Sequence, residues 1–94
     1  MPAMICRRLT ITGRVQNVFY RGWLIEQAEA IGITGWVRNR ADGSVEALVA
    51  GSREMIDAIV AKARQGSPAS RVADVVVEEV AAQVFDGFEK RPTA

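Results

Sequence analysis

The chain has 94 residues, 49% of them apolar, which is enough for one hydrophobic core and too little for two. We therefore expect a single domain over residues 1–94, with an ordered body from about residue 4 to residue 90. Twelve basic and 11 acidic residues give a formal net charge of +1 and form no basic block. Such a balance argues against a nucleic-acid partner, which would call for a run of cations.

The composition also narrows the chemistry and the compartment. Histidine is absent and Cys6 is the only cysteine, which excludes Ser-His and Cys-His nucleophile pairs and the usual zinc ligands. We interpret Cys6, in an apolar stretch, as a buried, inert thiol. The N-terminus lacks the features of a secretory signal, and no apolar run approaches the ~18 residues of a membrane span. We expect a soluble, cytoplasmic monomer without a membrane partner.

Alternating apolar and polar residues predict a first strand over residues 5–12, and Gly13 is expected to end it. Apolar residues at helical spacing then predict a helix over residues 21–31, with Gly32 as its stop. Two strand-like runs follow at residues 36–40 and 45–50. The pair Asp42-Gly43 between them is a strong signal for a hairpin turn.

The second half of the chain predicts another helix and another strand. Ser52 is a candidate N-cap, and Gly66, Ser67 and Pro68 are expected to end the helix. Its apolar stripe consists of Met55, Ile56, Ile59, Val60 and Ala63. A run rich in β-branched residues predicts a strand over residues 72–80, although the consecutive valines leave its buried parity open.

The predicted order is strand, helix, strand, strand, helix, strand. This order is typical of an α+β, ferredoxin-like βαββαβ sandwich, with a four-stranded antiparallel sheet and both helices on one face. Residues 85–90 are a candidate for a short additional edge strand. Residues 1–4 and 91–94 are expected to be loose.

The segment from Gly13 to Val18, with the sequence GRVQNV, joins the first strand to the first helix. Backbone N–H groups without helical partners can converge on an anion at such a position. Arg21 lies at the start of the helix, where it opposes the positive end of the helix dipole unless an anion is shared between them. The segment alone leaves a second interpretation equally open, namely a solvated arginine beside an ordinary loop.

Asn39 is the second candidate site residue. In a split βαβ arrangement the first two strands run parallel, and their C-terminal ends meet at one edge of the sheet. Asn39 shares a strand face with Val37, so it looks toward the helices if Val37 packs beneath them. Its amide could orient a water without competing with an anion for Arg21. Taken alone, a turn residue that hydrogen-bonds local backbone is the favoured alternative.

These two stretches resemble the acylphosphatase family, whose motifs read G-x-V-Q-G-V-x-F-R and G-[aromatic]-V-x-N-x-x-x-G-x-V followed by five residues and Gly. The second motif is matched throughout by Gly35, Trp36, Val37, Asn39, Gly43, Val45 and Gly51. The first is matched at Gly13, Val15, Gln16, Val18 and Arg21. Asn17 stands where the motif has Gly, and Tyr20 stands where it has Phe. Asparagine enters the left-handed region less freely than glycine.

The resemblance implies the ferredoxin-like fold and the hydrolysis of small acyl phosphates to a carboxylate and inorganic phosphate. It implies that Arg21 and loop backbone amides hold the phosphoryl group and that Asn39 positions the attacking water. The implied substrate-binding residues are Val15, Gln16, Asn17, Val18, Phe19 and Tyr20. No metal and no organic cofactor is implied.

Two other functions fit parts of the sequence. The element order also serves RNA-recognition domains, but those stack bases on aromatic residues of central strands, and the first and third strands here have none. The other alternative is an anion-binding regulatory module that has kept the loop and lost turnover. This alternative is suggested by Asn17, which stands where the family motif has Gly.

Overall fold

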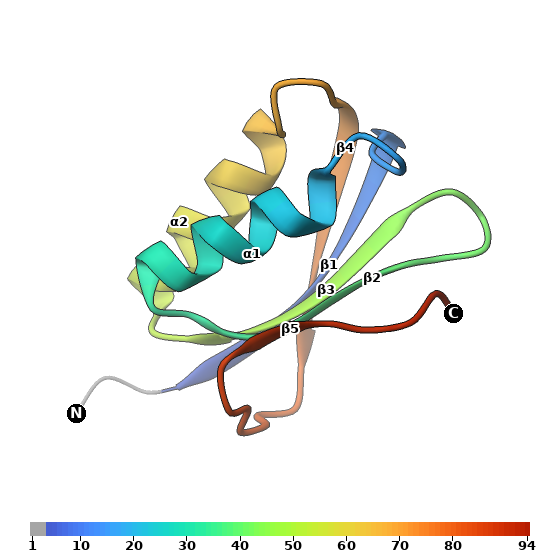
Figure 1. Ribbon diagram of the computed structural model, residues 1–94. Coiled ribbons are helices and arrows are strands. Elements are labelled where there is room, and N and C mark those ends of the chain that lie inside the picture. The colour runs from blue at the N-terminus through green and yellow to red at the C-terminus, as the bar shows by residue number, and fades with distance from the viewer. Residues whose placement is uncertain (1–3) are drawn as a thin grey trace.

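The computed structural model describes residues 4–94 as a five-stranded sheet with two helices on one face (Figure 1). Residues 1–3, most of the N-terminal segment expected to be loose, lie outside the described residues. The elements are β1 (Ile5–Arg14), α1 (Tyr20–Ile31), β2 (Thr34–Asn39), β3 (Val45–Gly51), α2 (Arg53–Gln65), β4 (Arg71–Val80) and β5 (Phe88–Lys90). The predicted ferredoxin-like order and the position of both helices are confirmed.

The strands lie in the order β4-β1-β3-β2-β5. The first four pair antiparallel, whereas β5 pairs parallel with the edge strand β2. The sheet therefore has five strands and not the four predicted. The additional edge strand β5 has three residues and is shorter than the candidate segment 85–90. Since β3 lies between β1 and β2, the C-terminal ends of β1 and β2 share one edge of the sheet.

The strand β1 continues past Gly13, so the prediction that this glycine ends the strand is wrong. A shift in register between Thr12 and Gly13 marks a bulge, after which pairing with β4 resumes as far as Arg14 and Arg71. Gly13 has a φ of 115°, and a Cβ there would collide with the carbonyl oxygen of Arg71. The glycine thus allows a bulge and a close strand approach rather than a stop.

The connection between β2 and β3 confirms the predicted hairpin. Its backbone closes through the N–H of Arg40, which donates to the carbonyl oxygen of Ser44 at 2.8 Å. Asp42 Oδ1 accepts from the N–H of Ser44 at 2.9 Å and from its Oγ at 2.6 Å. These hydrogen bonds hold the pKa of Asp42 below its ordinary value.

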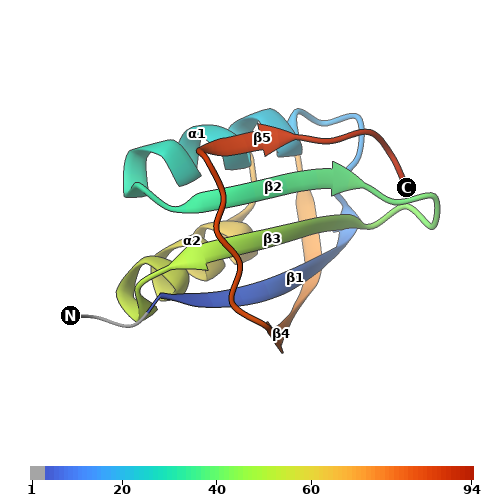
Figure 2. The same cartoon turned by 90° about the horizontal axis from the view of Figure 1, so that it is seen from below.

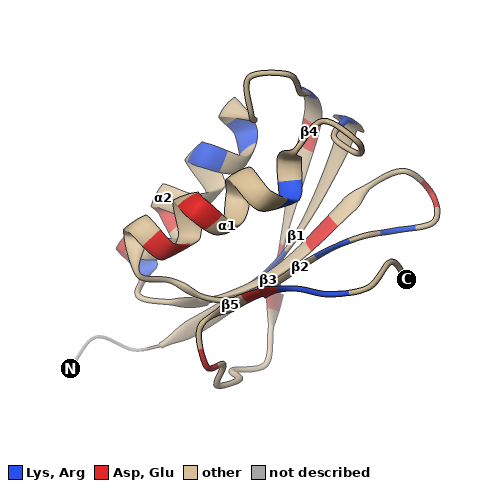
Figure 3. Ribbon diagram, in the orientation of Figure 1, with Lys and Arg blue, Asp and Glu red and all other residues tan. Residues whose placement is uncertain are grey.

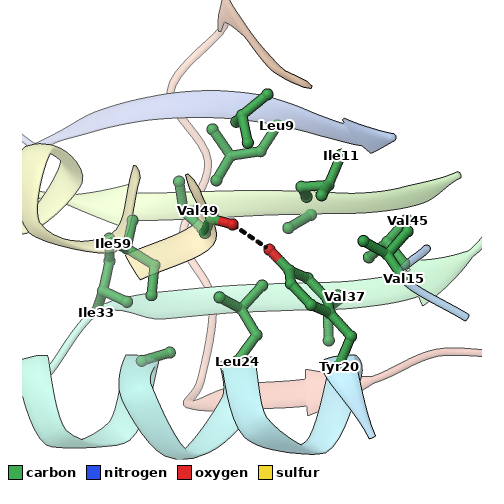
Figure 4. Packing of buried hydrophobic residues seen from close by; sticks show 14 of the residues in the cluster. Leu9, Ile11, Val15, Tyr20, Leu24, Ile33, Val37, Val45, Val49 and Ile59 are labelled. Atoms are coloured by element: carbon green, nitrogen blue, oxygen red, sulfur yellow. Dashed lines mark hydrogen bonds between the residues drawn. The ribbon is translucent and has the colours of Figure 1, made fainter. Parts of the chain in front are cut away.

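The core lies between the helices and the sheet (Figure 4). Helix α2 begins after Ser52, whose Oγ accepts from the N–H of Met55 at 3.3 Å as predicted. The predicted apolar stripe is confirmed, because Ile56, Ile59 and Ala63 are buried, and Met55 and Val60 are partly buried and pack against the same core. In β4, Val75 joins the core, which resolves the parity of this strand.

The chain after β4 crosses the opposite face of the sheet before it reaches β5 (Figure 2). Cys6, 1% exposed, accepts through Sγ from the N–H of Gln83 at 3.2 Å. The predicted burial of this thiol is confirmed. Residues 91–94 are not loose, because the N–H of Arg91 donates to Val37 and the N–H of Ala94 donates to Asn39. These bonds continue the pairing with β2 beyond Lys90.

A buried carboxylate lies on the same open face of the sheet. The side chain of Glu46 in β3 is 4% exposed. It meets Arg38 Nε at 2.7 Å, Arg8 Nε at 3.2 Å and Arg40 Nη1 at 3.2 Å. Trp36 packs beside this cluster, with the Arg38 guanidinium 4.7 Å from its ring centroid. The Glu46 cluster therefore joins β1, β2 and β3 through ion pairs.

Candidate functional site

The loop of residues 15–19 joins β1 to α1 and curls at one end of the sheet (Figure 1). Asn17 and Phe19 have φ values of 61° and 58°, both in the left-handed region. Among residues with a side chain, asparagine is one of the few that enters this region readily. Asn17 therefore adopts the curl for which the family motif uses glycine.

The side chains of the loop divide into two groups. Val15 and Tyr20 are each 1% exposed and belong to the core, and Val18 packs partly against it. Asn17 and Phe19 are exposed, with Phe19 at 67%. The inward residues can reach a ligand only through their backbone.

The backbone N–H groups of residues 15–22 are the most distinctive feature of the site. None of them donates a hydrogen bond to a backbone carbonyl or to a side chain within residues 4–94. The first turn of α1 also contains no acidic residue that could accept from them. A curled run of free N–H groups ahead of a helix N-terminus forms a concave anion-binding surface.

Side chains attach this loop to its surroundings on two sides. Gln16 Nε2 donates to the carbonyl oxygens of Arg40 at 2.8 Å and Ser44 at 2.9 Å, both in the β2–β3 hairpin. On the other side, Ser67 Oγ donates to the carbonyl oxygen of Val18 at 3.3 Å. The Gln16 side chain thus fixes the loop to the hairpin, and only its backbone remains available for an anion.

Tyr20, the second departure from the motif, lies at the start of α1 with its ring in the core. Its hydroxyl donates to the carbonyl oxygen of Ala63 at 2.9 Å (Figure 4). Burial raises the pKa of this phenol above its ordinary value. The hydroxyl joins the first turn of α1 to the last turn of α2.

Arg21, the second residue of α1, is half-buried and makes no ion pair within residues 4–94. It lines a pocket of about 130 Å³ beside the loop. The complete lining is Val15, Asn17, Phe19, Tyr20, Arg21, Gly22 and Lys90. Sequence reasoning missed Lys90, because its place beside α1 depends on the parallel pairing of β5 with β2.

Asn39 ends β2 on the helix side of the sheet, as its shared face with Val37 predicts. It is 8% exposed, and its buried Oδ1 has no hydrogen-bond partner within residues 4–94. The alternative of a side chain bonded to local backbone is therefore not observed. Gln16 contacts the residue that follows Asn39, so the loop and Asn39 occupy one edge of the sheet. Asn39 does not itself line the pocket of Arg21.

Within residues 4–94, the pocket thus offers an anion two cations and no carboxylate, at the same end of the sheet as an amide oxygen without a hydrogen-bond partner. Such a combination suits the binding of a phosphoryl group next to a water molecule. Across the described residues, no three Cys, Asp or Glu side chains gather as a metal site. No helix in the same part of the chain is both long and apolar enough for a membrane crossing.

Comparison with known proteins identifies the relatives of this chain. The acylphosphatase family model matches residues 7–90. An acylphosphatase from Rhizorhabdus wittichii is 49% identical over 92 residues, which cover 98% of this chain and 93% of that protein. The solved acylphosphatase of Coxiella burnetii has a TM-score of 0.90 at 33% identity and covers 94% and 93% of the two chains.

The solved acylphosphatase of Bacillus subtilis gives the same result, with a TM-score of 0.89 at 32% identity. The alignment covers 95% of this chain and 99% of that one. Sequence, length and fold therefore agree across nearly the whole chain. The chain belongs to the acylphosphatase family.

Proposed function

We propose that this chain hydrolyses acyl phosphates through direct attack of a water on a phosphoryl group, which is held by the β1–α1 loop and Arg21. Membership of the acylphosphatase family supports the reaction. The observation that carries the assignment of residues is the run of free N–H groups over residues 15–22 beside Arg21. The products are a carboxylate and inorganic phosphate.

In this mechanism Arg21 and the loop amides bind the oxygens of the phosphoryl group. Phosphoryl transfer proceeds through a loose transition state and gains mainly from positioning and from charge stabilisation. The loop is suited to both, because Gln16 and Ser67 fix it in place before substrate arrives. Val15, Gln16, Asn17, Val18, Phe19 and Tyr20 contribute their backbone amides.

Asn39 orients the attacking water in this proposal. Its buried Oδ1 has no hydrogen-bond partner within residues 4–94, and a buried acceptor of this kind is normally satisfied by a donor such as water. A water that donates one proton to Oδ1 keeps a lone pair free for attack on phosphorus. The amide carries no charge, so it neither repels the phosphoryl oxygens nor competes for Arg21.

The leaving group explains how a chain without histidine can catalyse this step. A carboxylate leaves as a stable anion and scarcely needs a general acid. The proton of the attacking water can pass to the phosphoryl group itself. A phosphomonoester expels a much more basic alkoxide or phenolate, so it should react poorly at this site.

The test is the hydrolysis of benzoyl phosphate in EDTA, with p-nitrophenyl phosphate as the monoester comparison. We expect Arg21→Ala to lose on the order of 10² to 10³ in kcat/KM or more. Arg53→Ala, an exposed arginine on α2 that removes the same charge, should retain wild-type activity. Full activity of Arg21→Ala would refute the proposal.

Asn39→Ala separates water positioning from anion binding. We expect a large loss of kcat with little change in the affinity for inorganic phosphate, because the proposed task of Asn39 is to place water. Equal losses of turnover and of phosphate affinity would show that Asn39 binds the phosphoryl group instead. Activity in EDTA and gel filtration of the active protein test the expected independence of metal and the expected monomer.

An anion-binding module without turnover is the second candidate. It rests on Asn17, which replaces the motif glycine, but Asn17 adopts the left-handed conformation that the curl requires. Phosphate binding by a folded wild type that does not hydrolyse benzoyl phosphate would favour this module over the enzyme.

A further inference from the structure

Lys90 is a basic residue of the pocket that the family motifs do not contain. It ends β5 and pairs with Val37 in the parallel register of β5 and β2. Val37 faces the helices from β2, and residues paired across neighbouring strands share a face of the sheet. The pairing therefore directs Lys90 to the helix side, where it lines the same pocket as Arg21.

The backbone around Lys90 is held firmly. Before it, the N–H of Gly35 donates to Gly87 at 2.9 Å, and after it, the N–H of Arg91 donates to Val37 at 2.9 Å. The backbone is thus hydrogen-bonded to β2 both before and after Lys90. Figure 3 shows basic residues at the start of α1 and at the end of β5.

The charge of this pocket is not balanced. Its lining contains two cations, Arg21 and Lys90, and no carboxylate. Neither cation makes an ion pair within residues 4–94. Five arginines outside the pocket do pair with acidic residues, namely Arg7, Arg8, Arg38, Arg40 and Arg91. Two unpaired cations beside a run of free N–H groups fit a ligand with two negative charges.

We propose that Lys90 is a second cationic ligand of the phosphoryl group, an inference that rests on the proposed function. A phosphate group carries close to two negative charges at neutral pH, and one arginine neutralises only half of them. Lysine provides a compact point charge on a flexible stem, which suits an accessory contact at the exposed mouth of the pocket. Arg21 supplies the fixed contact at the helix start.

The chain contains only two lysines, so Lys62 provides a matched control. Lys62 lies in α2 and does not line the pocket. We expect Lys90→Met to bind inorganic phosphate about tenfold more weakly at low salt, with the difference shrinking in 0.5 M salt because the contact is exposed. Lys62→Met should bind like wild type, and Lys90→Arg should keep most of the affinity. Unchanged phosphate affinity in Lys90→Met would overturn the inference.

A spectroscopic readout tests contact without relying on turnover. Labelling lysine at ¹³Cε gives two signals, and a phosphate titration should shift the Lys90 signal and leave the Lys62 signal in place. A Lys90 signal that stays in place at saturating phosphate would overturn the inference. So would a Lys90→Met variant with a higher KM for benzoyl phosphate and unchanged phosphate affinity, because the lysine would then serve the acyl group.

Failure of this inference is distinguishable from failure of the proposed function. If wild type hydrolyses benzoyl phosphate and Lys90→Met binds phosphate normally, the enzyme assignment stands and the role of Lys90 falls. If wild type binds phosphate without hydrolysis, the enzyme assignment falls. The phosphate titrations then still decide for or against Lys90.

Discussion

Replacing Tyr20 with phenylalanine restores the residue of the family motif, yet we expect it to destabilise this chain. The Tyr20 hydroxyl donates to the carbonyl oxygen of Ala63 at 2.9 Å. Ala63 lies in the last turn of α2, whose final four carbonyls have no partner within the helix. The N–H of Gly66 donates to the carbonyl oxygen of Lys62, and the Tyr20 hydroxyl donates to the carbonyl oxygen of Ala63 from across the core.

The expected loss follows from the burial of both groups. Tyr20 is 1% exposed and Ala63 is fully buried, so water cannot easily replace the hydroxyl. Leaving a buried acceptor unsatisfied costs about 1–3 kcal/mol, and we take about 1.5 kcal/mol for this site. For a domain of this size that corresponds to a decrease in Tm of about 6–12 °C.

Urea and thermal unfolding of wild type and Tyr20→Phe measure this loss. The kcat for benzoyl phosphate should not change, because the side chain points into the core and the backbone amide is retained. An unchanged urea midpoint would refute the argument, since it would mean that Ala63 needs no donor. A large fall in kcat with normal stability would also refute it, because the hydroxyl would then take part in catalysis.

The pH dependence of stability provides an independent check on the same group. Burial raises the pKa of Tyr20 in the folded state above the ordinary value of about 10, so the folded protein holds this proton more tightly than the unfolded chain does. The stabilisation that this tighter proton binding gives the folded state is complete below about pH 10, and it is lost as the pH rises further. Tyr20 is the only tyrosine, so Tyr20→Phe should lose less stability than wild type over this alkaline range.

Three further substitutions test the loop and the open face. Asn17→Gly should keep activity within about threefold, whereas Asn17→Val should destabilise the fold by about 1–2 kcal/mol and weaken phosphate binding, because a β-branched residue resists a φ of 61°. Equal phosphate affinity in the two variants would contradict this account. Gln16→Ala removes two hydrogen bonds to the hairpin and should lower kcat/KM for benzoyl phosphate about tenfold. An unchanged kcat/KM in this variant would show that the loop keeps its shape without these hydrogen bonds. Glu46→Gln should lower the free energy of unfolding by about 2 kcal/mol in urea, because three half-exposed arginines lose a buried counter-charge, and it should leave kcat unchanged. An unchanged free energy of unfolding would mean that the cluster adds no net stability.

Local chemistry was enough to predict most elements of the fold. The Asp42-Gly43 turn and the Ser52 cap each depend on hydrogen bonds within three residues, and the structure contains both. The orientation of Asn39 was also predictable, because strand parity fixes the side on which each residue lies. Arg21 was predicted to lie at a helix start, and it is the second residue of α1.

The features that the sequence did not reveal depend on contacts between distant segments. Gly13 supports a bulge because β4 passes against it, and that strand begins more than 50 residues later. Residues 91–94 are ordered by bonds to β2 and the hairpin that no local pattern predicts. Lys90 reaches the pocket only because β5 pairs parallel with β2. Pattern analysis finds the residues that shape a local turn and misses those that depend on strand order.

The hydrogen bonds around the loop also explain how it can remain both rigid and free to bind an anion. Gln16, Ser67 and Tyr20 attach the loop and the start of α1 to the rest of the molecule, and each of them donates to a backbone carbonyl. These bonds use the acceptors of the loop, the hairpin and α2 and use none of the N–H groups of residues 15–22. A tether that accepted from those N–H groups would have filled the site with protein oxygen. The loop is therefore positioned through carbonyl oxygens while its N–H groups stay unused, which is the preorganisation that the proposed binding of a phosphoryl group requires.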